Sequence, residues 1–136
     1  MRMKRILAMV TALTFMSGAA WQVSAHHSFV GQFDPEKLVT MSGTVTKLEW
    51  TNPHAFFYID VEDSDGNVTN WALELGSPNT LIRYRWGRDT MKVGDEVTVE
   101  GYLARDGTNL ANAKTVTFPD GRVVNAGSSS ELGSTR

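Results

Sequence analysis

The chain of 136 residues contains no cysteine. Disulfide bonds, thiolate metal sites, a cysteine nucleophile and a lipidated N-terminal cysteine are therefore excluded. The sequence also lacks a G-x-S-x-G elbow, an H-E-x-x-H pair and a glycine-rich phosphate loop. No residue pattern argues for an enzyme, and the sequence leans toward a protein without catalytic activity.

Long apolar runs are missing beyond the N-terminus, which has the three parts of a secretory signal peptide. Arg2, Lys4 and Arg5 form a basic patch, an apolar run covers residues 6–20, and Val23-Ser24-Ala25 offers a small-residue cleavage site. The run is shorter than the ~20 residues of a membrane-spanning helix. We expect a signal peptide over 1–25, cleavage after Ala25, and a periplasmic or secreted mature protein without membrane contact.

Basic residues are too few for a nucleic-acid partner. The chain has 13 Lys and Arg against 15 Asp and Glu, a formal net charge of −2. Cleavage after Ala25 would remove three basic residues and no acidic ones, leaving a charge of about −5. Phosphate backbones require a basic surface, so we expect no nucleic acid among the partners.

Alternation of apolar and polar residues predicts five β-strands in the mature chain. They cover residues 38–50, 54–62, 68–75, 96–104 and about 113–118. The first strand changes phase between Val45 and Leu48, which indicates a β-bulge. Trp50, Trp71 and Trp86 are expected to fill the interior and the helix contact.

A short helix is expected between the third and fourth strands, because Ser77 and Pro78 suit its start and Gly87 suits its end. This order of elements is that of the OB-fold, and a generic β-sandwich explains the helix less well. We therefore expect an all-β, five-stranded OB-like Greek-key barrel over 26–122. The Ser- and Gly-rich segment 123–136 is expected to be a disordered C-terminal tail.

The three histidines are the candidates for metal binding. His26 and His27 would begin the cleaved chain, and His54 opens the second strand. An N-terminal histidine can chelate an ion through its α-amine and its ring, and a second imidazole completes a nitrogen-rich plane that suits Cu(II). Phe29 and Phe33 would hold this segment against the barrel. We expect a copper site from His26 and His54, with His27 as an alternative ligand.

A purely structural role is the competing interpretation of these histidines. The pair at 26–27 would then be an unstructured start, and His54 would bond a loop carbonyl or Glu74. Isolated histidines of this kind are more often structural than ligands.

Aromatic side chains suggest a second kind of site. His54, Phe56 and Tyr58 share the face of the second strand opposite its aliphatic residues. In OB-folds the second and third strands form the usual ligand face, so these rings, with Glu74 beside them, could bind a saccharide or a periplasmic protein partner. The alternative is that the N-terminal segment covers Phe56 in a satellite core.

Several short motifs together resemble a family of small exported bacterial proteins that is known only as a domain of unknown function. They are His26-His27-Ser28-Phe29, Phe33-Asp34, Gly43-Thr44-Val45, Trp50-Thr51-Asn52-Pro53-His54, Trp71, Ser77-Pro78 and Gly94-Asp95-Glu96-Val97. The resemblance spans the mature domain to about Gly121 and implies no activity. It does imply that the histidine pair and the Asn-Pro-His turn belong to the family's own pattern. One departure is Arg85, where the family pattern has glycine before the helix tryptophan.

Overall fold

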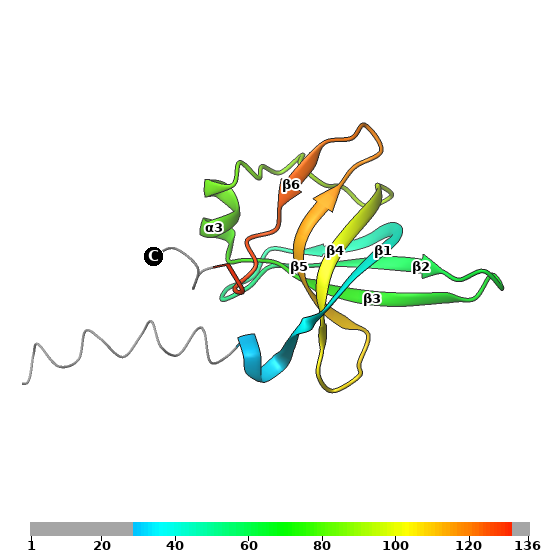
Figure 1. Ribbon diagram of the computed structural model, residues 1–136. Coiled ribbons are helices and arrows are strands. Elements are labelled where there is room, and N and C mark those ends of the chain that lie inside the picture. Colours follow the sequence, from blue (N-terminus) through cyan, green and yellow to red (C-terminus); the bar gives the residue numbers. More distant parts are fainter. Residues whose placement is uncertain (1–28, 132–136) are drawn as a thin grey trace, which may run out of the picture.

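The structure is a computed structural model that describes residues 29–131 of the chain. A helical turn at 29–32 is followed by six strands and one short helix (Figure 1). The elements are β1 (Phe33–Glu49), β2 (Phe56–Glu62), β3 (Val68–Glu74), α3 (Pro78–Arg83), β4 (Glu96–Ala104), β5 (Leu110–Thr117) and β6 (Val123–Asn125). The protein is thus all-β, and the expectation of five strands is corrected to six. In the part of the chain described here, no helix is both long and apolar enough to cross a membrane.

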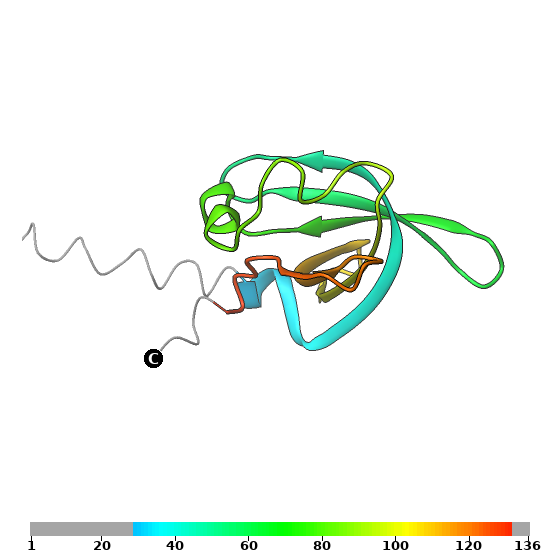
Figure 2. The same ribbon diagram turned by 90° about the horizontal axis from the view of Figure 1, so that it is seen from above.

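The strands form one sheet in the order β3-β2-β1-β4-β5-β6. These neighbours are antiparallel, and β3 additionally pairs in parallel with β5 through Ala72–Leu110 and Glu74–Asn112. β1 is long enough to pair with β4 along its first part and with β2 along its last part, and it curves strongly between them (Figure 2). This arrangement brings the last residues of β3 beside the first residues of β5, although the two segments are distant in sequence.

The predicted bulge in β1 is confirmed, because the β1–β2 register shifts between Val45 and Lys47. Just before it, Gly43 lies where β1 passes close to β2. A β-carbon at Gly43 would overlap the backbone carbonyl oxygen of Asp60 and lie 3.3 Å from Cβ of Ile59. The absence of a side chain at this position is therefore a condition for the pairing.

The main core lies inside the curved sheet. The inward face predicted for β2 is confirmed, with Ala55, Phe57 and Ile59 fully buried. Trp86 is buried in the same cluster, and Trp71 packs against it. Trp50 differs from the expectation, because it is 44% exposed and only meets Trp86 edge-on, with ring centroids 6.3 Å apart.

Helix α3 begins as predicted but ends earlier than Gly87. Ser77 is its N-cap and accepts a hydrogen bond from the Thr80 N–H at 3.2 Å. At the other end the Arg85 N–H donates to Ile82 O and the Trp86 N–H donates to Leu81 O, each at 3.0 Å. This pair of hydrogen bonds is a Schellman motif. Its left-handed residue is Arg85, with φ of 66°.

Replacing Arg85 by glycine is expected to stabilise the protein by about 0.5–1 kcal/mol, because a left-handed conformation is strained for residues with a β-carbon. The shift in the urea midpoint measures this gain. Arg88→Gly is the matched control, since the positive-φ residues do not include Arg88. An Arg85→Gly variant that loses as much stability as Arg88→Gly would contradict the explanation.

The segment after residue 122 is part of the folded domain, which corrects the expectation of a disordered tail for residues 123–131. β6 pairs with β5, and Ala126 and Ser128 are buried. The Trp86 indole donates to the Asn125 carbonyl at 2.7 Å, and the Gly76 N–H donates to the Ala126 carbonyl at 2.9 Å. Small residues here allow close backbone packing, so their abundance did not indicate disorder. Residues 132–136 lie outside the described range.

Candidate functional site

His54 lies in the connection between β1 and β2, and hydrogen bonds fix the backbone around it. The Thr51 hydroxyl donates to the His54 carbonyl at 2.8 Å. The Ala55 N–H donates to the Gly76 carbonyl at 3.1 Å, and the Ala55 carbonyl accepts from the Leu75 N–H at 2.8 Å. These contacts hold the connection against the end of β3, so the position of His54 is set by the sheet.

The His54 imidazole faces the carboxylate of Glu74, the last residue of β3. Nδ1 of His54 lies 3.4 Å from Oε1 of Glu74, and the side chains are 36% and 6% exposed respectively. Burial raises the pKa of the Glu74 carboxyl above its ordinary value, while the charge of His54 and a hydrogen bond from Asn112 act in the opposite direction. With Nδ1 directed at the carboxylate, Nε2 is the ring atom left for an external ligand.

A buried chain of polar side chains supports Glu74 from behind. Asn112 Nδ2 donates to Glu74 Oε1 at 3.0 Å. The Ser128 hydroxyl donates to Asn112 Oδ1 at 2.5 Å and accepts from the Ser130 N–H at 3.2 Å. Because the Ser128 proton is used toward Asn112, the Ser130 hydroxyl, 2.7 Å away, donates to Ser128. The chain therefore runs from the C-terminal segment through β5 to the carboxylate, with every donor pointing toward Glu74.

The N-terminal segment is held on the domain by aromatic packing, as predicted. Phe29 and Phe33 are buried, and the Phe29 ring meets the Tyr102 ring edge-on at 5.5 Å. Tyr102 is paired with Asn112 across β4 and β5. Phe29 and Ser130 also line one hollow of about 470 Å³. Both views show the helical turn at 29–32 beside the C-terminal segment (Figures 1 and 2).

The structure brings together three of the residues singled out from the sequence: His54, Phe56 and Glu74. Phe56 pairs with Glu74 across β2 and β3 and is half-buried, but it is not part of the apolar cluster around Phe29. Tyr58 lies farther along the same face. Its hydroxyl donates to Glu49 at 3.0 Å, and the ammonium of Lys47 lies 5.2 Å from its ring centroid.

His26 and His27 lie outside the described residues, so their proximity to His54 stays a prediction. Within residues 29–131, no three His, Cys, Asp or Glu side chains gather in a way that could hold a metal ion.

Asn112, Ser128 and Ser130 were not predicted as site residues. Asn112 is the one polar residue between the buried Ala111 and Ala113, and this was a usable signal for a buried polar role. Ser128 and Ser130 gave no such signal, because they belong to the stretch whose composition suggested disorder.

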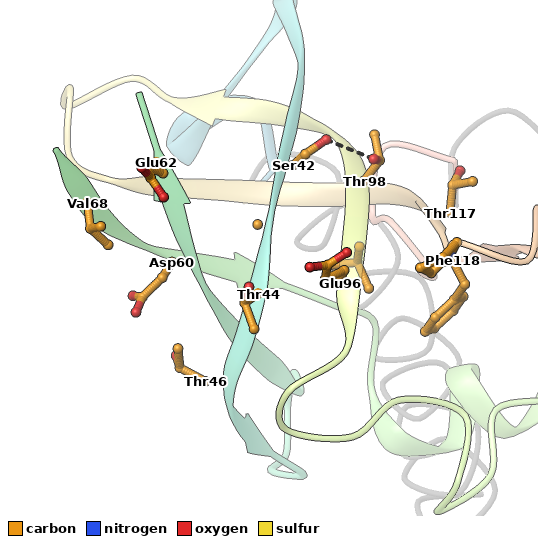
Figure 3. A pocket seen from close by; sticks show the side chains of 13 residues that line it. Ser42, Thr44, Thr46, Asp60, Glu62, Val68, Glu96, Thr98, Thr117 and Phe118 are labelled. Atoms are coloured by element: carbon orange, nitrogen blue, oxygen red, sulfur yellow. Dashed lines mark hydrogen bonds between the residues drawn. The ribbon is translucent and has the colours of Figure 1, made fainter. Parts of the chain in front are cut away.

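A second hollow, of about 540 Å³, lies on another part of the sheet (Figure 3). Its lining is mixed, and its polar side chains include Asp60, Thr44 and Glu96, which the strand register aligns across β2, β1 and β4. The Ser42 and Thr98 hydroxyls are hydrogen-bonded to each other at 2.8 Å. Ser42, Thr44 and Glu96 are exposed and Asp60 and Thr98 are half-buried. Among residues 29–131, no buried polar chain like that behind Glu74 supports them.

Comparison with known proteins identifies a family whose function is unknown. The model of a family of unknown function, DUF6152, matches residues 13–113, which is more than half of the chain. No curated protein matches the sequence.

Proposed function

Because the chain belongs to DUF6152, a family of unknown function, we propose a function from its own geometry: binding of a copper ion. In this proposal the exported protein is cleaved after Ala25, and the α-amine and imidazole of His26 bind the ion together with Nε2 of His54. His27 is the alternative ligand. In this proposal the protein holds the ion or hands it over.

The observation that carries the proposal is the contact between His54 and the buried Glu74. Histidines that bind metals characteristically direct their second ring nitrogen at a carboxylate or a carbonyl, which fixes the ring and raises its basicity. A buried carboxylate supported by further polar side chains costs folding free energy and is typical of functional sites. A purely structural His54 is also expected to contact Glu74, so copper binding itself separates the two interpretations.

The burial of Phe29 provides the second argument. Only three residue steps separate Phe29 from His26, and each spans at most about 3.5 Å. The N-terminus of a chain cleaved after Ala25 therefore stays within about 10 Å of Phe29. That residue packs on Tyr102, the neighbour of Asn112 in the network behind His54.

An OB-like barrel remains the proposed fold class. It is supported by the circuit of strand pairs β1–β2, β2–β3, β3–β5, β5–β4 and β4–β1. The position of α3 between β3 and β4 also agrees with it. The site proposed here lies where β2, β3 and β5 meet, next to the ligand face typical of that fold.

The test is a copper titration of the exported protein, with the start at His26 verified by mass spectrometry. We expect one Cu(II) per chain and a nitrogen-rich tetragonal EPR spectrum. A chain with three glycines added before His26 should bind at least about 100-fold more weakly, because the amine and the ring of His26 no longer form one chelate and neither histidine is among the first three residues of the longer chain. Equal affinity of the two chains would disprove the N-terminal site.

A second candidate function is recognition of a protein or saccharide by the face that carries Phe56 and Tyr58. Its support is the partial exposure of Phe56 beside Glu74. The engagement of the Tyr58 hydroxyl by Glu49 weighs against it, because that group is already bonded.

A further inference from the structure

We propose that Asn112 and Ser128 are positioning residues for His54: their hydrogen-bonded chain holds the Glu74 carboxylate against Nδ1 and so selects the ring tautomer that leaves Nε2 free. The inference deepens the copper-binding proposal and rests on it for its functional meaning. Its structural content, the tautomer of His54, can be measured without any metal.

The first step is the orientation of the Asn112 amide. The side chain is 1% exposed, so its orientation is set by neighbouring groups and not by water. Ser128 donates to Oδ1 and Glu74 accepts from Nδ2, so one orientation satisfies both contacts. The flipped amide would place an oxygen against the carboxylate and lose that bond, whereas the Ser128 hydroxyl can turn to accept from the N–H₂ group, so the contact with Glu74 fixes the orientation.

The second step is the effect on Glu74. Oε1 is the atom that both accepts from Asn112 and faces His54 Nδ1. A hydrogen bond from a buried amide restrains this oxygen, and the upstream bonds from Ser128 and Ser130 polarise the amide further in the same direction. The carboxylate therefore stays in place beside the imidazole.

The third step is the ring itself. A neutral imidazole carries its proton on one nitrogen only, and the hydrogen bond or charge beside that nitrogen selects it. A carboxylate held at Nδ1 favours the proton there, because a lone pair at Nδ1 would face negative charge. Nε2 then carries the lone pair that a metal ion requires.

The experiment is NMR of the ring nitrogens in metal-free, ¹⁵N-labelled protein at alkaline pH, where imidazole rings are neutral. In the unaltered protein we expect the two His54 nitrogens to have the well-separated shifts of a single Nδ1–H tautomer. In Asn112→Leu and Ser128→Ala, the separation should shrink toward that of a tautomer mixture, and more so in Asn112→Leu.

Ser42→Ala is the control, because it is the same substitution and removes the Ser42–Thr98 hydrogen bond, but Ser42 lies on β1 in the second hollow. It should leave the His54 shifts unchanged. If Asn112→Leu does not fold, Ser128→Ala decides the question. Unchanged His54 shifts in folded Ser128→Ala, or an Nε2–H tautomer in the unaltered protein, would overturn the inference.

Copper titration of the same variants then connects the tautomer to binding. Ser128→Ala and Asn112→Leu should weaken copper binding by roughly 10-fold, the effect typical of changes behind a metal ligand. A protein that shows the expected tautomer but binds no copper would refute the proposed function and leave the positioning role intact. Normal copper affinity in a variant with a changed tautomer would overturn the link between the two.

Discussion

Replacing His54 by alanine is expected to lower copper affinity by at least about 100-fold, or about 2.7 kcal/mol of binding free energy. The variant loses the one proposed ligand that the sheet holds in place, and the remaining donors belong to a single residue at the chain end. Competition with a chelator of known affinity measures the loss. The EPR spectrum of any residual complex should also change, because one nitrogen donor is gone.

Tyr58→Ala is the matched control for this loss. Tyr58 lies on the same face of β2 and makes its own polar contact with Glu49, but it does not contact the network behind His54. Its removal should leave copper affinity within about 2-fold of normal while affecting any partner that uses the aromatic face. If both variants bind copper normally, the histidine is structural and the aromatic face becomes the leading candidate.

Replacing Gly43 by alanine is expected to destabilise the fold by about 3 kcal/mol, the upper end of the range for overpacked positions. The added carbon would overlap the Asp60 carbonyl, and a backbone group paired in the β1–β2 ladder cannot move aside as a flexible side chain can. Equilibrium urea unfolding followed by tryptophan fluorescence measures the change.

Gly87→Ala serves as the control for Gly43→Ala. A β-carbon at Gly87 would have no heavy atom within 4 Å outside its chain neighbours, and its φ is not positive. This variant should be neutral or slightly stabilising, because alanine reduces the conformational entropy of the unfolded chain. A Gly43→Ala variant as stable as Gly87→Ala would show that the β1–β2 approach tolerates a side chain at Gly43.

Local sequence signals predicted the features of the fold that depend on neighbouring residues. The alternation in β2, the bulge after Val45 and the N-cap at Ser77 each follow from a few adjacent side chains. The helix end was missed because Arg85 adopts the left-handed conformation that glycine usually supplies. Leu81 and Trp86 are buried in the same apolar cluster. This tertiary packing outweighs the usual preference of a residue with a β-carbon for a right-handed conformation.

Long-range contacts explain what the sequence could not show about the site. The link from Glu74 to Asn112 joins residues 38 positions apart and follows from the parallel β3–β5 pairing. Ser128 joins the hydrogen-bonded chain behind Glu74 only because β6 returns the chain toward the end of β3. Composition marked this segment as unable to bury anything, although its small side chains are the ones that fit there.

The hydrogen-bonded chain behind His54 is built from distant parts of the sequence, and this determines when the site is completed during synthesis. His54 and Glu74 are made early in the sequence, but their support comes from β5 and from the residues after β6. During synthesis the pair therefore stays without this support until Asn112 and Ser128 have emerged. A partly folded or C-terminally shortened protein would present His54 without this restraint, so the proposed ion binding would depend on completion of the fold.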